Sequence, residues 1–188
     1  MCGISGAVYL NNFDKDKANF YTTQAIKDIY YRGPDDNSKF EINNVSLGSC
    51  RLAINDLRDI ANMPMISKCS RYILVFNGEV YNFKELRQEL NSSFEFLTNS
   101  DTEVVLNSYI KFGSKCFDNF HGMFALAIWD NLKKKLILAR DRLGKKPLFY
   151  KIENEILYFC SEINPLIKYG KENKKINSKF IDEIALFG

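Results

Sequence analysis

Cys2, directly after the initiator methionine, is the residue of this chain best suited to covalent chemistry. Methionine is normally removed before a small residue, and its removal would leave a free α-amine on the residue that carries the thiol. A thiol pKa of about 8.5 and an α-amine pKa of about 7.7 to 8.0 are close enough for proton exchange near neutral pH. Cys2 could therefore be both a nucleophile and its own base, although a cysteine in second position can also occur by chance.

Histidine, the usual base of a cysteine nucleophile, occurs once in this chain. His121 stands beside Gly122, and no metal-ligand spacing surrounds it, which favours a packing or capping role. A Cys–His nucleophile pair would have to use this residue. We therefore expect catalysis without histidine and without a metal.

Asn77-Gly78 follows the strongest strand-like run of the sequence, residues 72–76. An Asn-Gly pair between two apolar runs is the commonest signal of a tight hairpin, and on this pattern alone we expect a turn. The same pair could form an oxyanion hole, in which the Asn amide and the Gly N–H point at the oxygen that becomes negative when an amide is attacked. The two interpretations are compatible.

Arg51 and Asp101 could bind the two charged ends of a small substrate. Arg51 could equally be an ordinary charge at a strand end, and Asp101 could simply favour the N-terminus of its helix through the helix dipole. A zwitterionic substrate needs a cation for its carboxylate, preferably a guanidinium, and an anion for its ammonium group. In isolation the structural interpretations would be preferred.

Apolar periodicity predicts the elements that must position these residues. Strands are expected over residues 4–10, over 40–54 as a hairpin, and over 72–76, 123–129, 136–140, 148–152 and 156–160. Helices are expected over residues 18–30, from Asn82 to about Leu90, from Ser100 to Gly113 and over 163–169, with capping-box spacing at Asn82/Glu85 and Ser100/Glu103. The last four strands are separated by turn residues at hairpin-like intervals. Strands flanked by a few helices indicate an α+β domain.

Composition sets the class of protein. With 188 residues and 46% hydrophobic side chains, the chain can bury a full core as one domain. A net charge of +3 is too even to indicate nucleic acid or an anionic membrane as a partner. The five cysteines are widely spaced and odd in number, which disfavours a disulfide framework or a zinc site. No long apolar segment or secretory leader is present, so we expect a soluble cytoplasmic protein.

Short motifs along the chain resemble, in order, those of class II glutamine amidotransferases, which are N-terminal-nucleophile hydrolases. They are most similar to the glutaminase domain of the asparagine synthetases. The motifs are Met1 to Gly6, Arg32 to Asp35, Arg51 to Leu57, Asn77 to Asn82, Ser100 to Glu103, Gly122 to Ala125, Trp129-Asp130 and Arg140 to Leu148. Several motifs in the correct order are more specific than any one of them. The resemblance implies an α+β, four-layer αββα fold with two stacked antiparallel sheets.

The resemblance also implies a mechanism. Cys2 would attack the side-chain amide of glutamine, the α-amine would move the proton, and Asn77 with the Gly78 N–H would stabilise the oxyanion. Ammonia would leave, and water would release glutamate from the thioester. The substrate-binding residues implied by position are Arg51 for the carboxylate, Asp101 and the Glu79 region for the ammonium group, and the backbone around Ile54 and Asn55 as pocket lining.

The resemblance further predicts how the chain is organised. Residues 2–170 would form the glutaminase domain, and residues 171–188 would begin a linker toward a synthetase domain whose pyrophosphate loop does not occur here. Glutamine hydrolysis would need no cofactor, while ATP and magnesium would belong to the synthetase domain. The expected partners are L-glutamine and a synthetase domain or subunit that receives ammonia. Two alternatives stay open, namely a sugar or phosphoribosyl acceptor and a non-catalytic truncated remnant.

Overall fold

The protein's strands form two antiparallel sheets in the computed structural model, which describes residues 1–10 and 15–169. The strands are β1 (Gly3–Tyr9), β2 (Asp36–Ile42), β3 (Val45–Arg51), β4 (Met65–Ile66), β5 (Tyr72–Val80), β6 (Gly122–Asp130), β7 (Lys135–Arg140), β8 (Phe149–Glu153) and β9 (Ile156–Cys160). The first sheet has the order β2-β3-β1-β9-β8, and the second has the order β4-β5-β6-β7. β1 therefore lies at the centre of the first sheet.

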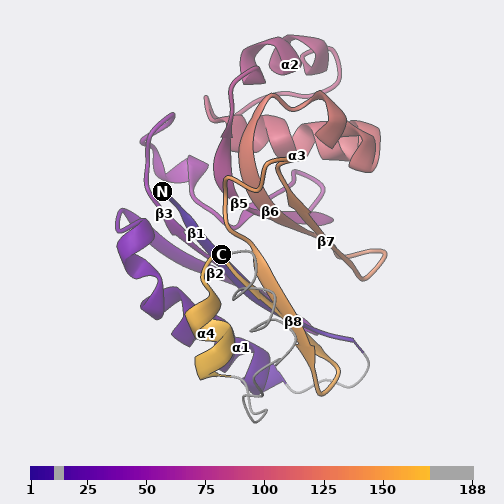
Figure 1. The fold of residues 1–188 in the computed structure, drawn as a ribbon. Helices are drawn as coiled ribbons and strands as arrows, with labels where there is room; N and C mark the ends of the chain where they lie inside the picture. The colour runs from indigo at the N-terminus through magenta and orange to yellow at the C-terminus, as the bar shows by residue number, and fades with distance from the viewer. Residues whose placement is uncertain (11–14, 170–188) are drawn as a thin grey trace, which may run out of the picture.

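Helices cover the outer face of each sheet. They are α1 (Lys15–Asp28), α2 (Phe83–Leu90), α3 (Asp101–Phe112) and α4 (Ile163–Lys168), with 3-10 turns η1 (Tyr30–Arg32), η2 (Asp59–Ala61) and η3 (Gly113–Asn119). Figure 1 shows α1 and α4 outside the first sheet, and α2 and α3 beyond the second. The predicted four-layer αββα arrangement is confirmed.

Alternation of side chains along the strands sorts the core into layers. In β1, Ile4 and Val8 pack between the two sheets, whereas Ala7 and Tyr9 pack toward α1. The same period governs β5, where Val75 and its odd-numbered neighbour Ile73 lie between the sheets. Each strand thus serves two apolar layers.

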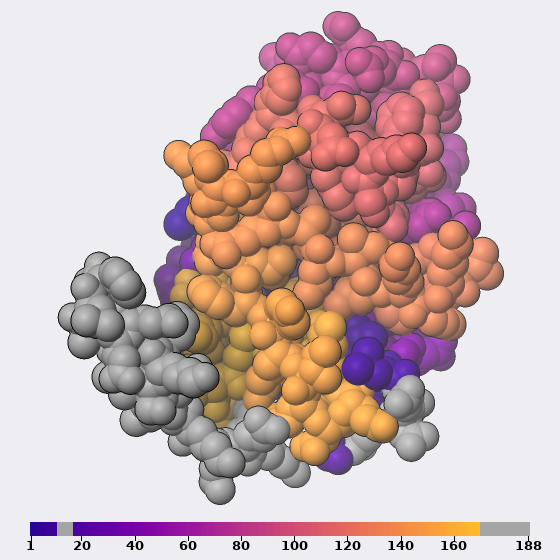
Figure 2. Space-filling model, turned by 45° about the vertical axis from the view of Figure 1, so that its right-hand side comes forward, coloured from indigo at the N-terminus to yellow at the C-terminus, as the bar shows by residue number. Residues whose placement is uncertain are grey.

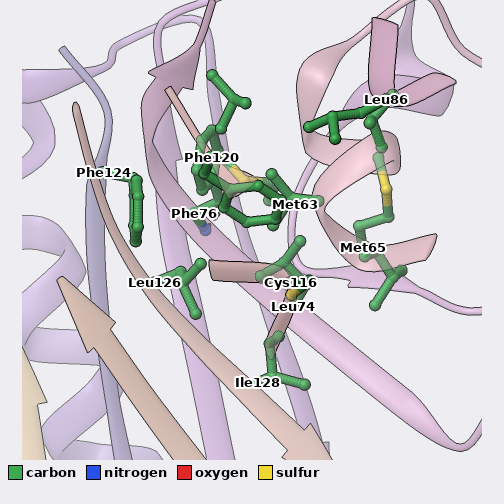
Figure 3. Packing of buried hydrophobic residues seen from close by; sticks show 14 of the residues in the cluster. Met63, Met65, Leu74, Phe76, Leu86, Cys116, Phe120, Phe124, Leu126 and Ile128 are labelled. Carbon is green, nitrogen blue, oxygen red and sulfur yellow. Dashed lines mark hydrogen bonds between the residues drawn. The ribbon is translucent and has the colours of Figure 1, made fainter. Parts of the chain in front are cut away.

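The outer layer of the second sheet is the largest apolar cluster. Leu74 and Phe76 of β5 and Leu126 and Ile128 of β6 point together away from the first sheet (Figure 3). They pack against α2, α3 and η3, whose buried residues belong to the same cluster. This packing fixes the position of β5 relative to α3, and therefore the position of the residues near the end of β5.

The prediction of a hairpin turn at Asn77-Gly78 is wrong. β5 continues to Val80, with Asn77 opposite Ala125 and Gly78 opposite Phe124 of β6. Long-range pairing with β6 overrides the local turn signal. The glycine is needed for close approach, since a Cβ at Gly78 would lie 2.5 Å from the Met123 carbonyl oxygen.

A second local prediction, that the segment between the strands expected over residues 136–140 and 148–152 is a hairpin turn, is also wrong. β7 belongs to the second sheet and β8 to the first, so this segment crosses from one sheet to the other. Figure 2 shows the orange residues after β6 running from the part of the molecule near α2 and α3 toward the part that contains α4. Turn residues indicate where a strand ends, not which sheet the next strand joins.

The two predicted capping boxes differ. Ser100 caps α3 by accepting a hydrogen bond from the Glu103 N–H (3.4 Å), as predicted. The Asn82 side chain makes no cap hydrogen bond with α2; it binds the Asn119 carbonyl oxygen (3.0 Å) and the His121 N–H (3.0 Å) instead. Contacts with Asn119, the last residue of η3, and with His121 therefore replace the local cap.

The predicted linker, residues 171–188, lies outside the described residues, as does residue 170 at the end of the predicted domain. The boundary between them stays a prediction. Within the described ranges, no helix is long and apolar enough to span a membrane.

Candidate active site

Three predicted site residues meet at one end of the space between the sheets. Cys2 immediately precedes β1, Arg51 ends β3, and Asn77 lies near the end of β5. Each lies two or four residues along the chain from a residue of the apolar layer between the sheets. Cys2 is two residues from Ile4, Arg51 is four from Leu47, and Asn77 is two from Val75. Strand alternation therefore directs all three side chains into the same layer.

A cavity of about 280 Å³ occupies this end of the sandwich. All eight predicted site residues line it: Cys2, Arg51, Ile54, Asn55, Asn77, Gly78, Glu79 and Asp101. Met1 also lines the cavity and is 59% exposed, so its removal would free the Cys2 amine inside the site. His121, the single histidine, is not among the lining residues.

The Cys2 thiol sits against the backbone that follows β3. The Leu52 N–H donates to Sγ over 3.4 Å. Burial raises the pKa of the Cys2 thiol, while the Leu52 N–H and the nearby Arg51 charge oppose that rise by favouring the thiolate. The Arg32 guanidinium donates from Nε to the Cys2 carbonyl oxygen (3.1 Å), which fixes the chain end beside the cavity.

The Asn77 side chain is 1% exposed, and neither its Nδ2 nor its Oδ1 has a hydrogen-bond partner among the described residues. Leaving a buried polar group unpaired costs about 1–3 kcal/mol, and most buried polar groups are paired. An unpaired amide that borders the cavity of a cysteine nucleophile is suited to an oxygen of a bound molecule.

The Gly78 N–H is a second free donor at the same place. Alternate N–H groups of an antiparallel strand point to the same side, here away from β6. Of these, the Phe76 N–H donates to Met63 Sδ (3.3 Å) and the Val80 N–H donates to Asp101 Oδ2 (3.0 Å). The Gly78 N–H lies between them and has no partner in the described part of the chain. The Asn77 amide and this N–H together have the composition of an oxyanion hole.

Arg51 is a buried cation surrounded by neutral oxygens. Its guanidinium donates to Asn62 Oδ1 (2.6 Å), to the Arg58 carbonyl oxygen (3.4 Å) and to the Asp56 carbonyl oxygen. Within residues 1–10 and 15–169, no carboxylate forms an ion pair with it. The charge is thus positioned by hydrogen bonds yet remains available for a carboxylate ligand.

Asp101 is the corresponding buried anion. Its carboxylate accepts from the Val80 N–H (3.0 Å) and from Asn55 Nδ2 (3.5 Å), and no cation pairs with it among the described residues. Burial raises the pKa of Asp101, the two hydrogen bonds lower it, and the Glu79 charge raises it. An ammonium group bound here would favour the ionised carboxylate.

Besides Asp56, whose carboxylate is paired with Arg58, sequence reasoning missed one charged residue of the cavity, Lys146. It is 6% exposed, lines the cavity, and its ammonium forms no ion pair within the described ranges. Asp141 positions it, since this carboxylate accepts from the N–H groups of Phe124, Leu143, Lys145 and Lys146 at 2.9–3.2 Å. The crossing between sheets brings Lys146 to the site, and no local signal could have indicated that crossing.

Comparison with known proteins agrees with this geometry. The profile of the glutamine amidotransferase domain family matches residues 1–188. Asparagine synthetase [glutamine-hydrolyzing] 3 of Bacillus subtilis is 36% identical over 193 residues, which cover 100% of this chain and 31% of that protein. Asparagine synthetase B [glutamine-hydrolyzing] of Escherichia coli is 36% identical over 168 residues, covering 89% of this chain and 30% of that protein. The chain thus spans about a third of the length of these relatives.

Proteins with other names also match this chain. Amidase chry2 of Gibberella zeae is 32% identical over 182 residues, covering 92% of this chain and 27% of that protein. The solved structure of glutamine phosphoribosylpyrophosphate amidotransferase from Bacillus subtilis superposes with a TM-score of 0.70 at 18% identity, covering 90% of this chain and 44% of that chain. The structural likeness establishes the shared fold.

Proposed function

Because the chain belongs to the glutamine amidotransferase domain family, we propose that it hydrolyses the side-chain amide of L-glutamine to glutamate and ammonia. One observation carries the proposal. The Cys2 thiol shares its cavity with two donors that lack partners among the described residues, the Asn77 amide and the Gly78 N–H. An attacking sulfur and a vacant oxyanion hole are what amide hydrolysis requires.

The proposed reaction begins after Met1 is removed. The Cys2 α-amine takes the thiol proton, and the thiolate attacks the amide carbon, so that the carbonyl oxygen becomes an oxyanion bound by Asn77 Nδ2 and the Gly78 N–H. The amine then gives its proton to the leaving nitrogen, and ammonia departs from the thioester. Water, deprotonated by the same amine, attacks the thioester carbon, and glutamate leaves as the thiol is restored.

Two charged groups would orient the substrate. Arg51, which has no carboxylate partner among the described residues, would bind the α-carboxylate, and Asp101 with the neighbouring Glu79 would bind the α-ammonium. Ile54 and Asn55 are exposed at the cavity, so their backbone would border its entrance. Binding both ends of the amino acid would place its side-chain amide at Cys2.

The ammonia would be used by a synthetase domain or subunit. Support comes from the relatives named asparagine synthetases, which are about three times as long as the matched region. ATP and magnesium would serve that synthetase, and glutamine hydrolysis itself would use no cofactor. Amidase chry2, by its name, supports hydrolysis of an amide without identifying an acceptor. A cytoplasmic setting is consistent with five free cysteines.

The test is glutamate release from glutamine, without ATP, by protein whose Cys2 N-terminus has been verified by mass. Two controls are needed: Cys2→Ala, which lacks the thiol, and protein that retains Met1, whose Cys2 amine is blocked. Release by the processed protein alone is expected. No release from folded, processed protein would contradict the proposal and favour the non-catalytic alternative.

A further inference from the structure

A second cavity of about 500 Å³ is lined in part by the loop that supports Arg51, through Ile60 and Asn62. It is bordered by the edge strand β4, by the turn after α2 and by α3. Much of its lining is apolar, including Met65, Leu97 and Leu106. Its size and composition are those of small-molecule sites, which combine apolar walls with a few polar groups.

Asn107 gives this cavity a specific polar group. The residue is 8% exposed and lines the cavity, and its side-chain amide has no hydrogen-bond partner in the described part of the chain. The amide atoms are not among the fully buried, unpaired polar atoms, so water in the open cavity reaches them, and a bound molecule with a matching group can take the place of that water. Since an amide offers one acceptor and two donors, the matching group is another amide.

The charges around the cavity favour a neutral ligand. The buried Glu103 carboxylate lines it and already accepts from the Leu97 N–H (3.0 Å), the Thr98 N–H (2.7 Å) and the Thr98 hydroxyl (2.7 Å). Lys68 is the one cation among the lining residues; it is exposed and forms an ion pair with Glu95 (3.1 Å). An anion would therefore meet Glu103 without a free cation to offset it.

We propose that this cavity binds a small neutral molecule with an apolar body and an amide group that pairs with Asn107. The cavity is separate from the glutamine site, but the two share a contact. Asn62 lines the second cavity, and its Oδ1 accepts the 2.6 Å hydrogen bond from Arg51. A ligand that touches Asn62 changes how firmly Arg51 is held, so its binding and glutamine binding are coupled. This coupling rests on the proposed function; the binding site itself does not.

Benzamide, benzoate and ethylbenzene are suitable probes, because all three have an apolar ring and only benzamide carries an amide. Binding is measured by calorimetry or NMR titration on the Cys2→Ala chain, which keeps the result independent of hydrolysis. We expect benzamide to bind about tenfold more tightly than either analogue, and Asn107→Leu to abolish that preference. Asn107→Asp, which keeps the side-chain shape, should weaken benzamide binding as well and serves if Asn107→Leu does not fold.

Three results would overturn the proposal: equal binding of the three probes, no binding of benzamide, or an unchanged benzamide preference in both Asn107 variants. For the coupling, the KM for glutamine of the processed enzyme is measured with and without benzamide. A KM change that disappears in Asn107→Leu is expected. Benzamide binding without any KM change would disprove the coupling.

Discussion

Asn77 is an exception to the rule that polar groups buried in a protein core are hydrogen-bonded. Its amide is fully buried at the end of β5 without a partner among the described residues. Such a group lowers stability while no ligand is bound, and it is retained where a ligand or transition state supplies the partner. The residue should therefore contribute to turnover rather than to folding.

Asn77→Leu separates these two contributions. We expect kcat for glutamine hydrolysis to fall by about a hundredfold, because one oxyanion donor is lost. The melting temperature should stay the same or rise, because a buried unpaired amide is replaced by an apolar side chain. Steady-state kinetics and thermal unfolding check both.

Ser46→Ala is the matched control, since the Ser46 hydroxyl is also buried without a partner within the described ranges but lies away from the cavity. Its kcat should equal that of the wild type. A marked loss of thermal stability in Asn77→Leu, with kcat preserved, would show that Asn77 has a structural role only.

At the scale of elements, the loop between β3 and β4 holds the Arg51 guanidinium in place and leaves its positive charge for a ligand. Asp56 anchors it: the carboxylate accepts from Arg58 Nε (2.9 Å) and from the Asn99 N–H (2.8 Å), and these contacts hold the pKa of Asp56 well below its usual range. From this loop, Asn62 and two carbonyl oxygens hold Arg51. Every group that holds Arg51 is neutral, so the loop positions the cation without neutralising it.

Substituting Asn62 tests that arrangement. Asn62→Asp keeps the side-chain shape but places a carboxylate against Arg51, so it should compete with the substrate carboxylate and raise the KM for glutamine by about tenfold or more. Asn62→Ala removes a positioning contact and should raise KM less. Initial rates across glutamine concentrations distinguish the two. Equal KM values for both variants would indicate that only packing at Asn62 matters.

The Asp130 carboxylate, at the end of β6, binds the Arg71 side chain just before β5. It forms a bidentate contact with Arg71 (2.9 and 2.7 Å), which lowers the pKa of Asp130 from its ordinary 3.8 to about 2. Because the folded-state pKa is depressed, the stabilisation is fully present above about pH 4 and is lost as the pH falls toward 2. We expect Asp130→Asn to reduce the free energy of unfolding at pH 7 by about 1.5–3 kcal/mol, and by much less near pH 2.

Denaturant unfolding of both proteins at the two pH values measures this difference. Asp118→Asn is a suitable comparison, because the Asp118 side chain is 82% exposed and lies 3.9 Å from Arg142. It should change stability little at either pH. A constant deficit in Asp130→Asn across the pH range would mean that the Arg71 contact is not its source.

The elements also show what local sequence could and could not predict. Apolar periodicity located nearly every strand and helix, because one buried face per element is enough to fix its type. The Asn-Gly turn signal misplaced a turn at Asn77-Gly78, since pairing with β6 is a long-range contact. The resemblance supplied the residues of the site, but Lys146 reaches it only through the crossing from β7 to β8.

On the scale of the whole molecule, the apolar layer between the sheets connects all other parts. Ile4 and Phe159 of the first sheet meet Val75 and Trp129 of the second in this layer. The candidate site lies at one end of the same layer, so the alignment of Cys2 with Asn77 depends on how the two sheets stack. We infer that the site and the fold are lost together.

Trp129, the single tryptophan, reports on this layer directly, because it is 1% exposed between the two sheets. If the shared layer makes the four-layer domain one cooperative unit, the denaturant midpoint from tryptophan fluorescence should coincide with that from far-UV circular dichroism. Trp129→Phe should move the dichroism midpoint to lower denaturant, because the smaller ring leaves a void against both sheets. Two separate transitions would instead show that each sheet unfolds with its own helices, and then the alignment of Cys2 with Asn77 could be lost while much of the secondary structure remained.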